Sequence, residues 1–267
     1  MRLRPRYASH VFGIALSLAV GLALGGGLYG FHWVPLSGFI VWGLAASIVS
    51  FILIGRRASK RLEPLMVEAQ KHVQAGRIDR AVEVLEQGFA VAKWHPMMPG
   101  QLEAQLGMLL YIAGREDAVP HLEAATRLAW TAKAMLGAYH FKKRDEVKMR
   151  AAFEQSLRSG RKVALAYMVY AYCLRELGKK DEAAAVLGRG IKNLKKPDPR
   201  LGSNLERLKE GKPFKTNLYG EQWLQFRLDK NMQSGKVMSP KGQRGISDPN
   251  HPALRGLRGK KMRLVRA

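Results

Sequence analysis

The sequence predicts an all-helical protein with three parts: an N-terminal helical hairpin in a membrane, a stack of helix pairs, and a basic tail. Two observations carry this prediction. Residues 7–55 contain no Asp, Glu, Lys or Arg, a longer uncharged stretch than a soluble domain keeps. The middle of the chain then repeats one helical pattern, and a structure built of stacked helix pairs is an α-solenoid.

The predicted hairpin consists of two apolar segments joined by a short turn. Residues 11–31 (VFGIALSLAVGLALGGGLYGF) form the first span and residues 39–55 (FIVWGLAASIVSFILIG) the second. At about 1.5 Å per residue, the first is long enough to cross a hydrocarbon core of about 30 Å. The turn between them, HWVPLSG, contains a proline that breaks helices.

The distribution of charge predicts the orientation of the hairpin. Arginines lie in the N-terminal residues 1–10, and RRASKR follows the second span, whereas the connecting turn has no Lys or Arg. The positive-inside rule then places both termini in the cytoplasm and makes the chain a multi-pass protein of the inner (cytoplasmic) membrane. The alternative is that the first segment is a cleaved signal peptide, which leaves the second span and its basic exit in place.

Small residues recur on both predicted spans. The string G-x-G-x-x-G at residues 25–30 is not a dinucleotide site, because no strand precedes it and no acidic residue follows about 20 positions later. Spacings of four between small residues are instead typical of closely packed membrane helices. The pairs are Gly21/Gly25 and Gly26/Gly30 on the first span, and Gly43/Ser47 and Ala46/Ser50 on the second.

Residues 62–197 repeat an apolar helix, a glycine, a polar turn with Asp or Glu, an alanine, and a leucine four residues later. Residues 72–89, 109–128 and 173–191 show the full pattern. The spacing of the turn glycines leaves room for a fourth unit at residues 130–157, where Arg144 stands at the turn position. One helix pair cannot bury its own apolar face, so about four pairs predict a stack.

Each position of the pattern has a physical role. The turn glycines, expected in a left-handed conformation, are Gly76, Gly114 and Gly178. The acidic residues, expected to cap the second helix of each pair, are Asp79, Asp117 and Asp181. The small residues that allow close helix approach are Ala81, Ala118 and Ala183. The leucines that fill the seam are Leu85, Leu122 and Leu187.

The pattern resembles the tetratricopeptide repeat (TPR) family over residues 63–197. This resemblance implies a concave groove, lined by the first helix of each pair, that binds a peptide or helix of a partner protein. The implied groove residues are Met66, Gln70, Met108, Tyr111, Phe141, Lys142, Met168, Tyr172 and Arg175. Flexible methionines, aromatic rings and a few cations suit a partly apolar ligand with some negative charge. The alternative for each residue is packing between helix pairs.

Two segments follow the predicted stack. Residues 198–230 are expected to be capping helices, because leucines recur on one helical face and Tyr219, Trp223 and Phe226 are spaced i, i+4, i+7. The alternative is that Trp223 and Phe226 form a docking patch for a partner. Residues 231–267 are basic and rich in Gly, Pro and Ser, a composition that predicts disorder.

The formal net charge of +24 lies mostly at the ends of the chain. Residues 1–61 carry seven basic and no acidic side chains, and residues 212–267 carry thirteen basic and three acidic ones. Three interpretations of the basic tail compete: attraction to anionic lipid head groups, binding of nucleic acid through its phosphates, and no dedicated ligand.

No motif for catalysis, a cofactor or a metal is recognisable in the sequence. The seven histidines form no H-E-x-x-H pattern, and no Walker loop or G-x-S-x-G elbow occurs. The single cysteine, Cys173, lies in an apolar helix and is expected to be a packing residue. The sequence therefore predicts a scaffold, not an enzyme, that recruits partner proteins at the cytoplasmic membrane face. The alternative is a tether for nucleic acid or ribosomes that acts through the tail.

Overall fold

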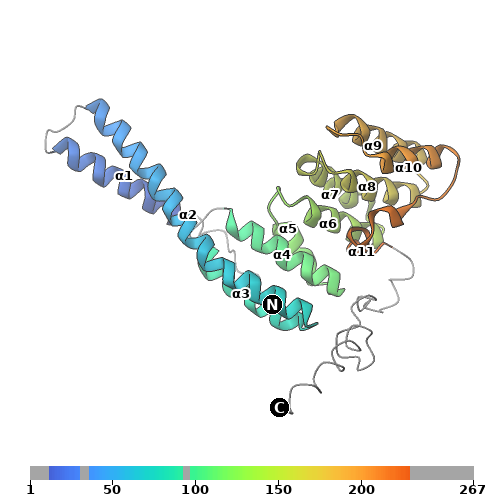
Figure 1. The fold of residues 1–267 in the computed structure, drawn as a ribbon, viewed down its shortest axis with the longest axis horizontal. Helices are drawn as coiled ribbons and strands as arrows, with labels where there is room; N and C mark the ends of the chain where they lie inside the picture. The colour runs from blue at the N-terminus through green and yellow to red at the C-terminus, as the bar shows by residue number, and fades with distance from the viewer. Residues whose placement is uncertain (1–11, 31–35, 93–96, 229–267) are drawn as a thin grey trace, which may run out of the picture. The chain divides into compact units, whose positions relative to one another are not determined.

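The computed structural model describes residues 12–30, 36–92 and 97–228, and every regular element within them is a helix (Figure 1). In chain order the helices are α1 (Phe12–Gly30), α2 (Leu36–Gln74), α3 (Ile78–Ala92), α4 (Met98–Ala113), α5 (Ala118–Ala124), α6 (Trp130–Lys142), α7 (Glu146–Ser159), α8 (Ala164–Glu176), α9 (Lys180–Asn193), α10 (Pro199–Lys209), the 3₁₀ helix η2 (Thr216–Tyr219) and α11 (Glu221–Leu224). The basic N-terminus, the predicted hairpin turn and the basic tail lie outside the described residues.

Helix α2 is continuous over 39 residues. It joins the second predicted span to the first helix of the predicted stack with no break, because the residues between them, RRASKRLE, are mostly good helix formers. Among the described residues, one helix, Ile40–Gln74, is long and apolar enough to cross a membrane, and the apolar stretch of α1, Gly13–Gly27, is shorter.

Helices α1 and α2 pack side by side through one of the two predicted small-residue faces. A Cβ atom at Gly21 would lie 1.9 Å from Ser47 Oγ and 2.4 Å from the carbonyl oxygen of Gly43. A Cβ atom at Gly43 would in turn lie 3.1 Å from the carbonyl oxygen of Gly21. By contrast, a Cβ atom at Gly26 would meet nothing within 4 Å. The face of Gly21 therefore closes the pair, and Gly26 lies on another face.

The helices from α2 to α9 pack as consecutive antiparallel neighbours joined by short turns (Figure 1). The expected left-handed glycines are confirmed, with φ of 71° at Gly76, 83° at Gly114 and 81° at Gly178. Arg144, which stands at the fourth turn, also has a positive φ, of 59°. The turn geometry is thus the same with and without glycine, and the arginine is strained there because its Cβ crowds the backbone.

Replacing Arg144 by glycine is expected to stabilise the protein. The left-handed conformation costs a non-glycine residue about 1–2 kcal/mol, and the greater freedom of glycine in the unfolded chain offsets about half of this gain. Arg144→Gly should therefore raise the free energy of unfolding by about 0.5–1 kcal/mol, measured by chemical denaturation. A neutral or destabilising result would show that the arginine side chain makes a compensating contact.

The expected capping role of the three aspartates is wrong. Helix α3 begins before Asp79 and α9 before Asp181, so both residues lie inside the first turn. Asp117 does hold the N-cap position of α5, but its side chain caps no backbone amide. Its carboxylate instead binds Arg115 at 2.7 Å, because a charged guanidinium is a stronger partner than a backbone N–H.

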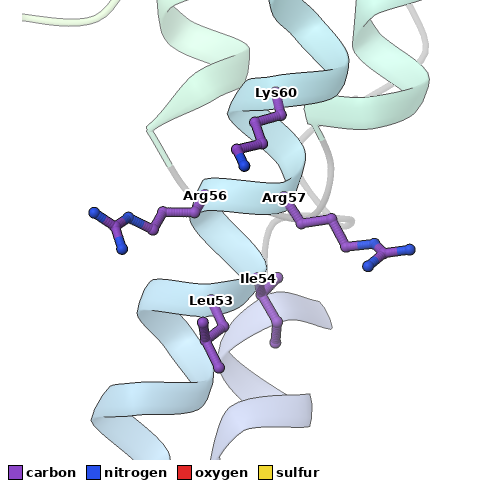
Figure 2. A pocket seen from close by; sticks show the side chains of 5 residues that line it. All are labelled: Leu53, Ile54, Arg56, Arg57 and Lys60. Carbon is purple, nitrogen blue, oxygen red and sulfur yellow. The ribbon is translucent and has the colours of Figure 1, made fainter.

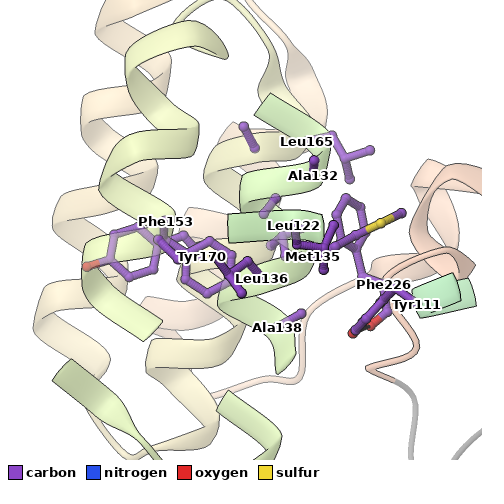
Figure 3. Packing of buried hydrophobic residues seen from close by; sticks show 14 of the residues in the cluster. Tyr111, Leu122, Ala132, Met135, Leu136, Ala138, Phe153, Leu165, Tyr170 and Phe226 are labelled. Carbon is purple, nitrogen blue, oxygen red and sulfur yellow. Dashed lines mark hydrogen bonds between the residues drawn. The ribbon is translucent and has the colours of Figure 1, made fainter. Parts of the chain in front are cut away.

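The seams between helices follow the predicted alanines and leucines, all of which are buried. Two helical glycines bring neighbouring helices into contact. A Cβ atom at Gly107 would lie 2.8 Å from the backbone nitrogen of Leu122, and one at Gly137 would lie 2.9 Å from the Phe153 ring. That ring stacks on Tyr170 with centroids 4.9 Å apart (Figure 3). Helices α6, α7 and α8 therefore share one tightly packed core.

Candidate protein-binding face

The nine predicted groove residues lie on α2, α4, α6 and α8, the first helix of each pair; we call the surface they belong to the first-helix face. They differ in exposure. Gln70 is exposed, Met168 and Tyr111 are buried, and the other six are half-buried. Met168, at 0% exposure, is a core residue of the stack, as the alternative interpretation expected for some of the nine.

Part of the first-helix face is covered by residues 214–228, which we call the C-terminal segment. The Phe214 ring lies under the guanidinium of Arg175 at 5.2 Å. Further along, the Trp223 ring meets Tyr172 edge to face, with centroids 5.0 Å apart. Two of the predicted groove residues are thus aromatic or cationic partners of the chain itself.

The end of the C-terminal segment lies on α4. The hydroxyl of Tyr111 donates a hydrogen bond of 2.7 Å to the backbone carbonyl of Phe226, and these two side chains lie together in Figure 3. The guanidinium of Arg227 donates to the backbone carbonyl of Tyr111 at 3.2 Å. The last carbonyls of a helix lack intrahelical donors and carry partial negative charge, so the arginine stabilises the end of α4.

This arrangement corrects the predicted helical spacing of the three aromatic residues. Helix α10 forms as expected, with Leu201 and Leu208 buried, but Tyr219 and Trp223 do not share a helix. Gly220 separates them with φ of 55°, and the segment contains only η2 and the four-residue α11. The aromatic side chains are buried against the first-helix face because the chain is extended enough to reach it.

Burial perturbs three ionisable groups beneath this segment. It lowers the pKa of the Lys142 ammonium to about 8, with repulsion from Arg227 adding to the effect. Burial also raises the pKa of the Tyr111 phenol and of the Cys173 thiol well above their usual values. A fully buried thiol held in its neutral form is a packing residue, as the sequence predicted, because the thiolate is the reactive form.

The charge of Lys142 should make stability depend on pH. Because the folded state lowers this pKa from 10.5 to about 8, the unfolded state binds more protons between these values, so this group adds stability as pH rises from 8 to 10.5. We expect Lys142→Met to raise the melting temperature at pH 7, where the penalty is full, and this gain to shrink toward pH 10. Tyr111 and Cys173 titrate in both proteins and cancel in the difference. A gain that stays constant with pH would contradict the assignment.

The covered part of the face combines strong apolar anchors with local costs. Burying each large apolar side chain of the segment contributes about 1.5–3 kcal/mol; those buried are Phe214, Tyr219, Trp223, Phe226 and Leu228. Against this, the Tyr219 hydroxyl is buried with no hydrogen-bond partner among the described residues, which costs about 1–3 kcal/mol. Arg227 also adopts a φ of 52°, at a cost of about 1–2 kcal/mol.

The other part of the first-helix face is open. A cavity of about 380 Å³ lies over α2, α4 and the connection from α5 to α6. Its lining is mostly apolar with three polar side chains: Leu62, Met66, Gln101, Leu102, Ala104, Gln105, Met108, Thr126, Leu128 and Ala129. Two predicted groove residues, Met66 and Met108, are among them. Leu128, which the sequence did not single out, is 62% exposed.

A cluster of cations lies where the apolar part of α2 ends. Figure 2 shows Arg56 and Arg57 extending from opposite sides of the helix and Lys60 one turn further on, above Leu53 and Ile54. All three cations are exposed, and none has an ion pair to a carboxylate of the described residues. The cluster matches the basic exit that the sequence predicts for the second span.

The described residues contain no group of three or more His, Cys, Asp or Glu side chains that could hold a metal ion. The nearest approach to such a group is one ion pair, 2.6 Å between His121 Nδ1 and Glu103 Oε2. Comparison with protein-family models, curated proteins and solved structures found no match to this chain. The geometry of the first-helix face is therefore the basis for a functional hypothesis.

Proposed function

We propose that this protein is a membrane-anchored scaffold whose TPR-like solenoid recruits a partner protein at the cytoplasmic face of the inner membrane. In this proposal α1 and the first part of α2 form a two-span anchor. The rest of α2 and the helices up to α9 form about four stacked pairs, and the first-helix face is the concave binding surface.

One observation carries the proposal: the first-helix face already holds a stretch of polypeptide that lacks long helices. It does so with aromatic contacts, such as that of Tyr172 with Trp223. It also uses a hydrogen bond from Tyr111 to a backbone carbonyl, which does not depend on the side chain of the bound residue. These are the two kinds of contact by which helical-repeat and groove proteins bind peptides.

The open cavity is the proposed site for the partner. Met66 and Met108 give it a flexible apolar floor, and Gln101 and Gln105 supply amides at its edge. Methionine-rich surfaces accept apolar side chains of different shapes. We expect the partner to insert one face of an amphipathic helix, with leucine, methionine or phenylalanine side chains entering the cavity.

Continuity of α2 supports a position close to the membrane. Six residues separate Arg56 from Leu62, the first cavity residue on this helix, a rise of about 9 Å. Confinement so close to a membrane raises the effective concentration of a membrane-bound partner. The exposed cations Arg56, Arg57 and Lys60 favour the cytoplasmic side for this end of the helix.

The proposed function is tested by crosslinking in intact membranes that contain the full chain, followed by mass spectrometry. The variant Met66→Glu/Met108→Glu places two charges in the cavity and should abolish capture of the proteins bound by the wild type. Val147→Glu is the matched control, since Val147 is 80% exposed on α7 and should leave capture unchanged. An identical set of proteins from the cavity variant and the wild type would contradict the proposal.

The proposed topology makes a separate prediction. A cysteine introduced at Val147 in a Cys173→Ala chain should resist a membrane-impermeant maleimide applied to the outer face of intact cells. The same cysteine should react fully after the membrane is permeabilised. Labelling in intact cells would place the helix stack on the outer side and contradict the proposed orientation.

A further inference from the structure

The covered part of the first-helix face offers a second binding site beside the open cavity. We propose that it is a docking site for a partner segment with two aromatic side chains three residues apart followed by an arginine, and that the C-terminal segment occupies it as a displaceable internal ligand. The inference rests on the proposed function, because it regulates access to the same face. It predicts that the protein controls its own capacity to bind partners.

The C-terminal segment has the properties of a bound peptide. Its helical turns, η2 and α11, have four residues each, and helices this short are unstable in water by themselves. Its order therefore comes from the first-helix face. Outside α10 the chain reaches the segment through Gly211, whose φ of 71° ends the helix and provides a joint at which the segment can separate.

The contacts define what the site recognises. Tyr172 takes the edge of Trp223, and the buried Phe226 follows three residues later with its carbonyl held by Tyr111. Arg227 comes next and donates to the end of α4. A Trp, an aromatic residue at i+3 and an Arg at i+4 is therefore the pattern that a competing segment has to supply.

The resident segment fits this site imperfectly, and that makes it displaceable. The hydroxyl of Tyr219 is buried with no partner among the described residues, and Arg227 is held in a left-handed conformation. Lys142 lies under the segment, and the groups that face it include a second cation, Arg227, beside Tyr111 and Cys173. A partner segment free of these features gains the same anchors without the unfavourable contacts.

The experiment measures binding of a fluorescent synthetic peptide with the sequence of residues 213–228 to the full chain in detergent or nanodiscs. The release variant Trp223→Ala/Phe226→Ala removes the resident anchors and leaves the face intact. It should bind the peptide at least tenfold more tightly than the wild type. Leu218→Ala, at an exposed position of the same segment, is the matched control and should behave as the wild type. Adding Tyr172→Ala to the release variant should abolish binding.

Equal affinity of the wild type and the release variant would overturn the inference, and so would absence of binding to a release variant that keeps its circular dichroism spectrum. If the release variant loses helix, hydrogen exchange of two glycine variants decides. Gly114 and Gly178 share a left-handed φ, but only at Gly114 would a Cβ atom meet Arg227, at 2.3 Å from Nη1. Exchange in residues 213–228 should be faster in Gly114→Ala than in Gly178→Ala; equal exchange would overturn the inference.

The two tests separate this inference from the proposed function. Loss of partner capture in Met66→Glu/Met108→Glu with no peptide binding by the release variant would leave the scaffold proposal standing and reject the internal ligand. Peptide binding with unchanged capture would reject the open cavity as the partner site.

Discussion

Phe153→Ala is expected to lower the free energy of unfolding of the helix stack by about 3–5 kcal/mol, the usual loss for a buried aromatic residue. The ring is 0% exposed and lies between two helices: it contacts Gly137 of α6 and stacks on Tyr170 of α8. Removing it leaves a cavity that backbone atoms on neither side can fill, because the helices are already in close contact.

The matched control for this prediction is on the same helix. Val147 of α7 is 80% exposed, and Val147→Ala should change stability by no more than about 0.5 kcal/mol. Urea unfolding of the full chain in detergent, followed by circular dichroism, measures both variants. A loss below about 1 kcal/mol for Phe153→Ala would show that α6, α7 and α8 do not share this core.

Gly21→Leu is expected to separate α1 from α2. Even a methyl group at this position would overlap Ser47 and the backbone carbonyl of Gly43, and backbone atoms cannot rotate away as a flexible side chain can. Overpacking of this kind costs about 1–3 kcal/mol, and close contact between small residues is the main attraction between helices in a membrane. A titration with SDS, followed by energy transfer between dyes on the two helices, should show earlier separation than in the wild type.

Gly26→Leu is the control, because a side chain at Gly26 meets nothing within 4 Å. It should leave the midpoint of the SDS titration unchanged. If both substitutions shift the midpoint equally, Gly21 does not lie at the contact between α1 and α2. If only Gly26→Leu shifts it, the other small-residue face closes the pair.

The helical framework could be predicted because it depends on local patterns. A glycine followed by a polar turn predicted the left-handed residues at three turns, and the spacing predicted a fourth at Arg144, where φ is also positive. Small residues four positions apart predicted contact between α1 and α2 but not which face of α1 makes it. That choice depends on the partner helix, since Gly43 and Ser47 face Gly21 and no described atom faces Gly26.

The binding face was predictable only in part. The first-helix positions were correctly placed on α2, α4, α6 and α8, since they follow from the same repeating pattern. The cover formed by the C-terminal segment could not be predicted, because it depends on contacts such as Tyr111 with Phe226, 115 residues apart in the sequence. A signal was present in the alternative that Trp223 and Phe226 form a docking patch, but periodicity favoured a helix that Gly220 interrupts.

The account depends most on contact between the first-helix face and the C-terminal segment. The most direct test places the photoreactive amino acid p-benzoylphenylalanine at position 226 of the full chain and maps its crosslinks by mass spectrometry. The account predicts an intramolecular crosslink to the end of α4, near Tyr111. Crosslinks to detergent or to other parts of the chain, with none to α4, would contradict it.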